Sequence, residues 1–209
     1  MIKPMSRAVI VALAVVMAAC TPSRPAEPLG PYTPSGATAI PGGPMEPTPT
    51  AKNPKIPGSQ QEAIDTVIKY LQRTVDALPK GTALDSTDAQ GGSNLSCDDD
   101  FAGPGPGPTE YDVTTHVAAP ANVSPTEIVA DIGDVWRSWG LKVIERSEFD
   151  KPNWFAYADD GYRLQIEIAH PATYPPTLTV ISPCFPGDLR DDDLARHNPG
   201  VITQSVPTN

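Results

Sequence analysis

Cysteine has the most reactive side chain in this sequence, and it occurs three times, at Cys20, Cys97 and Cys184. Cys20 directly follows an apolar run of 12 residues, Ala8–Ala19, and two cations stand among the first seven residues. A positively charged start, a short apolar run and small residues before the cleavage point are typical of a secretory signal peptide. The run is too short to span a membrane as a helix. We therefore predict that residues 1–19 are a signal peptide.

The residues Met17-Ala18-Ala19-Cys20 resemble the lipobox of bacterial lipoproteins, with Met17 where the family usually has leucine. The resemblance implies that the chain is cut before Cys20 and that a diacylglyceryl group is attached to its thiol. An ordinary signal peptide followed by an incidental cysteine is the alternative. Two acyl chains are enough for stable anchoring. We therefore expect a lipid-anchored protein of the cell envelope, on the outer face of the cell membrane.

If Cys20 carries lipid, Cys97 and Cys184 remain as a pair in an oxidising compartment. A disulfide between them would close a loop of about 87 residues and stabilise the fold by about 4–5 kcal/mol in the chain-entropy model. Two free, buried thiols are the alternative. A catalytic cysteine is disfavoured because no histidine stands at a spacing typical of cysteine enzymes.

Aspartates follow both of these cysteines: Asp98, Asp99 and Asp100 in one run, and Asp188, Asp191, Asp192 and Asp193 in the other. If the cysteines were bonded, the two runs would approach each other, and a Ca²⁺ ion could relieve their mutual repulsion. We favour solvated loop charges, because the glycine-turned loop of a dedicated calcium site is missing. We therefore expect no metal and no cofactor, and the weak calcium candidates are Asp98, Asp99, Asp100, Asp191 and Asp192.

Aromatic residues are a second candidate for ligand binding. Trp136 and Trp139 fall on a predicted helix, and Trp154, Phe155 and Tyr157 fall on the strand that follows it. We favour a core role for most of them, but on an open sheet face they could hold an acyl chain or a sugar ring. Because neighbouring strand residues point to opposite faces, Trp154 and Phe155 cannot both face the helices. We choose Trp154, with Tyr157, as the ligand contact.

No motif of a known enzyme class stands out. His116, His170 and His197 do not form the H-x-x-x-H or H-E-x-x-H spacing of zinc sites. The nucleophile elbow, the P-loop and the dinucleotide fingerprint do not occur. A net charge of −10 disfavours binding to nucleic acid and to anionic lipid headgroups. We expect a protein that is not an enzyme and has no nucleic-acid partner.

The elements that must position these residues lie between two stretches without apolar periodicity. Residues 20–58 contain eleven of the chain's 26 prolines, so we predict that, after the lipidated Cys20, they form a Pro/Thr-rich tether. Residues 186–209 have no apolar period either, and we predict a disordered tail. The folded domain is then residues 59–185.

Two helices and several strands are predicted within this domain. Ser59 with Glu62, and Ser124 with Glu127, form capping boxes, and each is followed by apolar residues at steps of three and four. Alternation predicts strands at residues 111–117, 141–149, 153–157, 162–169 and 177–184, and a loop at 91–107. Asp159-Asp160-Gly161 predicts a tight hairpin turn. This order favours a two-layer α+β fold, with a mainly antiparallel sheet of about five strands covered on one face by two helices.

The order of these features resembles the mycobacterial LppA-like lipoproteins and related small actinobacterial lipoproteins. The matching positions are Cys97-Asp98, Gly140, Gly161-Tyr162-Arg163-Leu164-Gln165-Ile166 and Cys184-Phe185. The resemblance implies a Cys97–Cys184 disulfide, a location in the cell envelope and a two-layer α+β fold. It implies no reaction.

We therefore expect a non-enzymatic binding or interaction module, held at the membrane by the lipid on Cys20. Its partner would be an envelope glycan, lipid or protein, bound through the uncovered sheet face. The alternative is a carrier of an envelope lipid or a hydrophobic small molecule, with a pocket between helices and sheet. A carrier needs an interior cavity of about 300 Å³ or more, so the packing of the core discriminates between the two.

Overall fold

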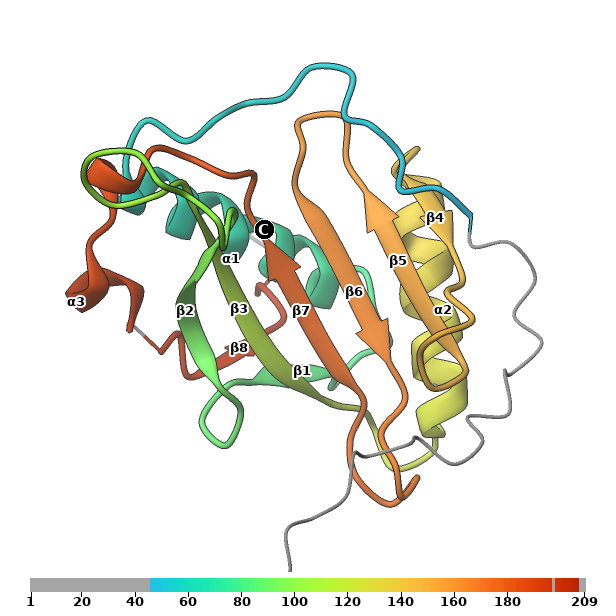
Figure 1. Ribbon diagram of the computed structural model, residues 1–209. Coiled ribbons are helices and arrows are strands. Elements are labelled where there is room, and N and C mark those ends of the chain that lie inside the picture. The colour runs from blue at the N-terminus through green and yellow to red at the C-terminus, as the bar shows by residue number, and fades with distance from the viewer. Residues whose placement is uncertain (1–45, 197, 207–209) are drawn as a thin grey trace, which may run out of the picture. The chain divides into compact units, whose positions relative to one another are not determined.

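A computed structural model of the chain describes residues 46–196 and 198–206 (Figure 1). The predicted signal peptide, Cys20 and the tether up to residue 45 lie outside these residues. The elements are, in chain order, α1 (Gln60–Asp76), β1 (Ala83–Asp85), β2 (Gly91–Ser96), β3 (Thr109–Ala118), α2 (Pro125–Ser138), β4 (Lys142–Ile144), β5 (Asn153–Tyr157), β6 (Arg163–Glu167), β7 (Thr177–Ile181), η1 (Gly187–Leu189), α3 (Asp192–Ala195) and β8 (Val201–Thr203). None of the described helices is long and apolar enough to cross a membrane.

Both long helices begin after the serine that the sequence predicts as the cap. Ser59 Oγ accepts a hydrogen bond from the backbone N–H of Glu62 at 3.1 Å. At α2 the capping is reciprocal, because Ser124 Oγ accepts from the Glu127 N–H at 3.2 Å and the Glu127 carboxylate accepts from the Ser124 N–H at 2.8 Å. These bonds satisfy backbone donors that have no partner within a helix. The two predicted helices are confirmed.

The strands form one antiparallel sheet in the order β4-β5-β6-β7-β3-β1-β8, with β2 paired to β3. One edge of β3 pairs with β7, and the other pairs with β2 and then with β1. The predicted α+β class is confirmed, but about five strands is too few, because the sheet has eight. The missed strands β1, β2 and β8 are short or rich in glycine and serine, so they lack alternation. In particular, the predicted loop 91–107 begins with β2.

The turn Asp159-Asp160-Gly161 joins β5 to β6 as predicted, with Tyr157 opposite Arg163. Gly161 has a φ of +94°, a backbone conformation in which a side chain would be strained.

The prediction of a disordered tail is wrong for the described part of residues 186–209. This segment forms η1, α3 and β8, and Ile202 of β8 lies opposite Leu84 of β1 and is only 8% exposed. The Gln204 side-chain amide donates to the carbonyl oxygens of Val75 and Leu78 at 3.1 and 2.8 Å, just where α1 ends. The segment is therefore ordered by contacts with residues far away in the sequence, which apolar periodicity does not report.

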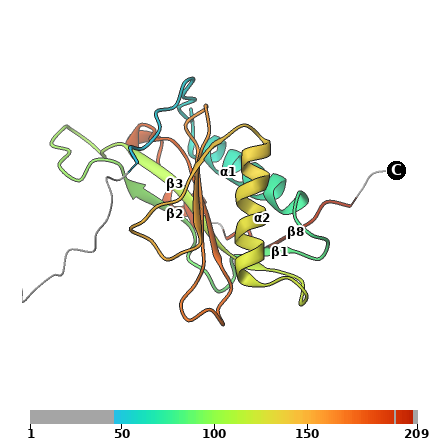
Figure 2. The same cartoon turned by 90° about the vertical axis from the view of Figure 1, so that its right-hand side faces the viewer.

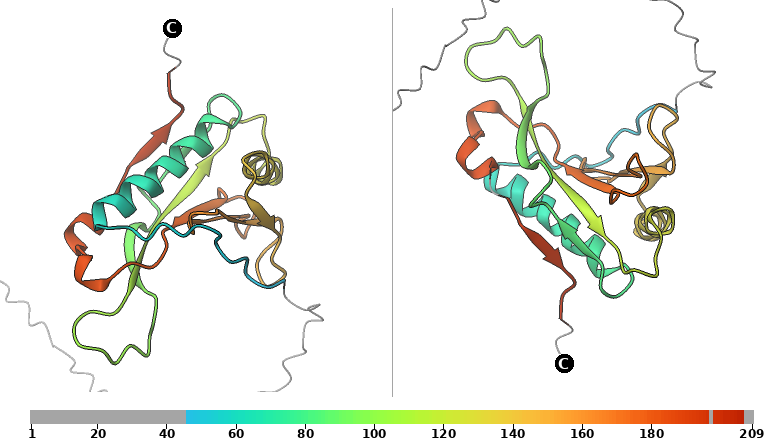
Figure 3. Two further views of the ribbon diagram at one scale, coloured as in Figure 1. Left: turned by 90° about the horizontal axis from the view of Figure 1, so that it is seen from above. Right: turned by 90° about the horizontal axis from the view of Figure 1, so that it is seen from below.

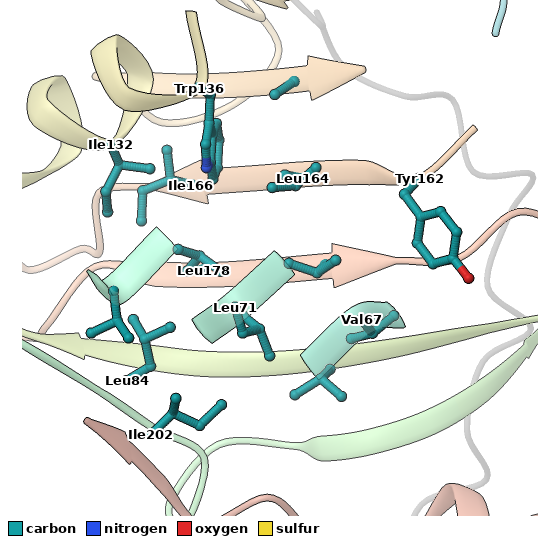
Figure 4. Packing of buried hydrophobic residues seen from close by; sticks show 14 of the residues in the cluster. Val67, Leu71, Leu84, Ile132, Trp136, Tyr162, Leu164, Ile166, Leu178 and Ile202 are labelled. Atoms are coloured by element: carbon teal, nitrogen blue, oxygen red, sulfur yellow. The ribbon is translucent and has the colours of Figure 1, made fainter. Parts of the chain in front are cut away.

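Both long helices lie on the same side of the sheet, so the other side is uncovered (Figures 1 and 2). α1 packs against β3 and β8, and α2 packs against β5, as the views from above and below show (Figure 3). Fully buried side chains fill the space between these layers (Figure 4). They include Leu71 of α1, Ile132 and Trp136 of α2, and Ile166 and Leu178 of the sheet.

The last part of the predicted tether is docked on the domain. Residues 46–58, which we call the strap, pass along one end of the sheet (Figure 1). The backbone N–H groups of Asn53 and Lys55 each donate at 2.8 Å to the carbonyl oxygens of Asp159 and Asp160 in the β5–β6 turn. The folded unit therefore begins before Ser59, and the predicted boundary at residue 58 is too late. Prolines do not prevent this docking, since they leave the N–H groups of the residues between them free to bond.

Candidate functional site

The aromatic side chains of β5 point to opposite faces of the sheet. Trp154 packs on α2: a Cβ added at Gly133 would lie 2.5 Å from its ring, and the Arg137 guanidinium lies 4.1 Å from the ring centroid. Phe155 points to the uncovered face, with its ring centroid 4.8 Å from that of Phe149. The prediction that Trp154 faces away from the helices is wrong, because a glycine in α2 leaves room for the indole. Phe155 takes the outward position instead.

Phe155 and Tyr157 line a hollow of about 340 Å³ on the uncovered face of β5, β6 and β7. We call it the sheet hollow. Its floor is the sheet, and its walls are the β4–β5 connection and the strap. The lining residues are Thr48, Arg146, Glu148, Phe149, Phe155, Ala156, Tyr157, Arg163, Leu164, Gln165 and Ile181. Tyr157 thus lies where a ligand could reach it, and its role as a ligand contact stays a prediction.

One buried side chain, Asn153, holds the wall of the sheet hollow in place. Its Oδ1 accepts a hydrogen bond from the Arg146 N–H at 2.8 Å. Its Nδ2 donates to the carbonyl oxygens of Arg146, Phe149 and Asp150 at 2.9, 3.3 and 3.0 Å. These bonds fold the connection so that Arg146 and Phe149 face the hollow. Sequence reasoning missed Asn153, because an asparagine beside a turn is too common to single out.

Arg146 places a buried positive charge in the sheet hollow. The residue is only 6% exposed, and its guanidinium donates to the Glu46 carbonyl at 2.6 Å, to Thr48 Oγ1 at 3.0 Å and to the Tyr157 hydroxyl at 2.7 Å. All three acceptors are neutral, and no carboxylate of the described residues forms an ion pair with it. A buried charge without a counter-ion is costly, so this site favours an anionic group.

Two carboxyl groups of β3 lie on the same face, beside the sheet hollow. Burial raises the pKa of Glu110 above its ordinary value and outweighs Arg163, whose Nη2 lies 2.5 Å from Glu110 Oε2. Burial likewise raises the pKa of Asp112, although Asp112 accepts a hydrogen bond from the Ser93 hydroxyl. Both groups therefore bind protons more readily than exposed carboxylates do.

The sulfur atoms of Cys97 and Cys184 are 2.10 Å apart, the distance of a disulfide bond, as predicted. Glu110 Oε2 lies 3.9 Å from each sulfur. Within residues 46–196 and 198–206, these three residues are the only group whose ligand atoms are close enough to share a metal ion. Disulfide sulfurs are not thiolates, so the group does not provide thiolate ligands while the bond is intact.

The structure does not bring the weak calcium candidates together. The Asp191 carboxylate accepts hydrogen bonds from the N–H groups of Asp193 and Leu194, both at 3.0 Å, and so caps α3. Asp192 forms an ion pair with Arg190 at 2.6 Å. In the part of the chain that the structure describes, no three of the candidates Asp98, Asp99, Asp100, Asp191 and Asp192 place oxygens near one point. Helix capping stabilises the carboxylate of Asp191, and the neighbouring Arg190 stabilises that of Asp192.

Comparisons with protein-family models, with curated proteins and with solved structures give no match for this chain. The similarity to LppA-like lipoproteins therefore stays a prediction from the sequence.

Proposed function

We propose that this chain is a lipid-anchored protein of the cell envelope and that its domain is a non-enzymatic module that binds an acidic glycan in the sheet hollow. The observation that carries this proposal is the combination of aromatic rings and the buried Arg146 guanidinium in one open hollow. Through the lipid on Cys20 the domain would stand at the outer face of the membrane, within reach of wall polymers.

The aromatic side chains support a sugar as the ligand. Phe149, Phe155 and Tyr157 present large, rigid apolar surfaces on which the C–H faces of a sugar ring can pack, and Tyr157 adds a hydroxyl group. A volume of about 340 Å³ lies in the range of small-molecule sites. The hollow is open to solvent on one side, so a unit of a longer glycan can enter while the rest of the polymer stays outside.

Arg146 supports an acidic sugar over a neutral one. A guanidinium carries five N–H donors, and three contacts are made here, so Arg146 retains donor capacity for a ligand. A carboxylate fits a planar guanidinium and would supply the counter-charge that Arg146 lacks. Gln165, which also lines the hollow, adds an amide group for the sugar hydroxyls.

The packing of the core favours this surface site over the carrier alternative. A carrier needs an apolar cavity between the helices and the sheet, and fully buried side chains such as Trp136 and Leu71 fill that space. The sheet hollow lies on the opposite face and is partly charged, which suits a glycan better than an acyl chain.

The proposal is tested by calorimetric titration of the mature chain, carrying Cys20→Ser so that no lipid is attached. The ligands are wall oligosaccharides with carboxylates and neutral oligosaccharides of the same length. We expect saturable binding of the acidic ligand and weaker binding of the neutral one. Phe155→Ala and Arg146→Met should each lower the affinity about tenfold or more, because each removes a contact worth about 1.5 kcal/mol or more.

Tyr174→Ala is the matched control for loss of an aromatic ring, because Tyr174 is exposed and lies outside the sheet hollow. Its affinity should equal that of the unsubstituted chain. Equal binding by Phe155→Ala, or no binding of any wall oligosaccharide, would contradict the proposal.

A further inference from the structure

A second hollow lies between α1, the strap and the β5–β6 turn, and it shares no lining residue with the sheet hollow. Its volume is about 280 Å³. Three cations line it, Lys55 from the strap and Lys69 and Arg73 from α1. We call it the cationic hollow. Lys69 and Arg73 are four residues apart, so they lie one above the other on the same face of the helix.

These three cations form no ion pair with any carboxylate of residues 46–196 and 198–206. Most of the other lysines and arginines in that part of the chain do, and the paired ones are Lys52, Arg137, Lys142, Lys151, Arg163, Arg190 and Arg196. Unpaired cations are unexpected in a chain with a net charge of −10, because carboxylates are in excess. Their concentration around one hollow therefore points to an anion from outside the chain.

The two carboxylates that also line the cationic hollow already have partners within the protein. The Glu62 carboxylate accepts a hydrogen bond from the Gly58 N–H at 2.8 Å. Asp160 accepts one from the Tyr70 hydroxyl at 2.9 Å and one from the Tyr162 N–H at 3.2 Å. These bonds hold the carboxylates against the backbone and the tyrosine, and three cations against two carboxylates leave a positive excess.

One of the cations and the backbone that carries another are held in position. The Arg73 guanidinium lies 3.9 Å from the centroid of the Trp139 ring, a cation–π contact that limits its movement. The backbone N–H of Lys55 donates to the Asp160 carbonyl, which fixes that point of the strap against the turn. The site therefore exists before a ligand arrives, and the ligand has less side-chain freedom to restrain.

We propose that the cationic hollow binds a phosphoryl group. Lysine and arginine side chains from the strap and from one face of α1 match the oxygens and the charge of a phosphate better than those of a single carboxylate. The volume leaves room for an organic substituent next to the phosphate, so the ligand is a small phosphate ester or the headgroup of a phospholipid. The net charge of the chain predicts repulsion from anionic headgroups. Around the cationic hollow, however, the three cations make the local charge positive.

The test uses the mature chain with Cys20→Ser, because an attached lipid would itself bind to vesicles. In one arm, inorganic phosphate and glycerol phosphate are titrated by calorimetry, with sodium chloride at equal ionic strength as the blank. In the other arm, co-sedimentation is measured with phosphatidylcholine vesicles that contain or lack phosphatidylglycerol. Binding of the soluble phosphates identifies a free ester as the ligand, and binding only to the anionic vesicles identifies a headgroup.

Lys69→Gln should lower the affinity about tenfold in whichever arm shows binding, because it removes one charged contact. Lys80→Gln is the matched control, since Lys80 is also an exposed, unpaired lysine of the described residues but does not line the cationic hollow. Its affinity should stay unchanged. The proposal is overturned if neither arm shows saturable binding, if Lys69→Gln binds as the unsubstituted chain does, or if Lys80→Gln loses as much affinity as Lys69→Gln.

Discussion

Two charged residues on the uncovered face of the sheet, Arg146 and Asp112, are largely buried. Arg146 is stabilised there by three neutral oxygens and Asp112 by a serine hydroxyl. Leaving a charge buried without an ion pair lowers the stability of a fold, and clusters of such groups are a feature of binding and catalytic sites. Their position beside the aromatic rings of the sheet hollow is consistent with a face shaped for binding.

Asp112 gives a pH-dependent prediction. Burial raises its pKa, so the folded state holds the proton more tightly than the unfolded state. The free energy of unfolding therefore falls as the pH rises from the unfolded pKa through the folded pKa. Asp112→Asn removes this loss of stability, and the asparagine can still accept a hydrogen bond from the Ser93 hydroxyl. The variant should be more stable than the unsubstituted chain at pH 7. The difference should shrink as the pH falls through the folded pKa, and it should be gone below the unfolded pKa of about 4.

Urea unfolding at a series of pH values measures this difference. Asp134→Asn is the control, because Asp134 is exposed and paired with Arg137 on the surface of α2. A gain in stability from Asp112→Asn that does not depend on pH would show that burial of the charge is not its cause.

Gly133 decides which aromatic residue of β5 faces α2. In an exposed helix position, replacing glycine by alanine adds about 1 kcal/mol of stability. At Gly133 the new Cβ would lie 2.5 Å from the Trp154 ring, so we expect Gly133→Ala to cost about 1–3 kcal/mol instead. Denaturant unfolding measures the change. In a Trp154→Ala background the cost should disappear, and a cost that persists there would mean that the contact is not its source.

At the scale of elements, the parts that follow from the sequence are those with local signals. Capping residues and apolar periodicity identify α1 and α2, and alternation identifies β5, β6 and β7. The strap and the C-terminal segment lack these signals. Their order depends on bonds such as Gln204 to Val75 and Asn53 to Asp159, between residues about 100 or more positions apart.

The sheet hollow is only partly predictable for the same reason. Alternation shows that Trp154 and Phe155 point to opposite faces of the sheet. Which of the two faces the helices depends on Gly133 of α2, which leaves room for the Trp154 ring. Arg146 enters the hollow because Asn153 folds the β4–β5 connection inward. No spacing within the sequence reports either interaction.

Ile202 tests whether the C-terminal segment is part of the core. Ile202 is largely buried where β8 packs against α1. Ile202→Ala should therefore lower the free energy of unfolding by about 2 kcal/mol. This value is at the low end of the range for buried isoleucine, because β8 is a short strand at the edge of the sheet. Denaturant unfolding measures the loss. Val201→Ala on the same strand is the control, since Val201 is 53% exposed and should have little effect. Equal effects of the two substitutions would contradict the packing of β8.

At the scale of the whole molecule, a strongly acidic chain carries two hollows with positive character. Arg146 lies in one, and Lys55, Lys69 and Arg73 surround the other. The strap joins them, because Thr48 lines the first hollow and Lys55 the second. Since the strap continues the predicted tether, both proposed sites lie close to the segment that would connect the domain to the membrane.

The lipid anchor gives the prediction for the whole chain. In a bacterial host that processes lipoproteins, the chain should be recovered in the membrane fraction, with a mass that corresponds to a diacylglyceryl group on Cys20. Cys20→Ser removes the predicted site of lipidation, and the protein should move to the soluble fraction or the medium. Fractionation followed by mass spectrometry measures both. Membrane association that survives Cys20→Ser would contradict lipidation as the anchor.

The most direct test of the proposed glycan site is NMR mapping of backbone amides during titration of the lipid-free mature chain with a carboxylate-bearing wall oligosaccharide. We predict saturable shift changes at the sheet hollow, above all at Phe149, Phe155, Tyr157 and Gln165, with little change along the buried face of α2. Shift changes confined to the helices, or none at saturating ligand, would contradict the assignment of the uncovered sheet face as the binding surface.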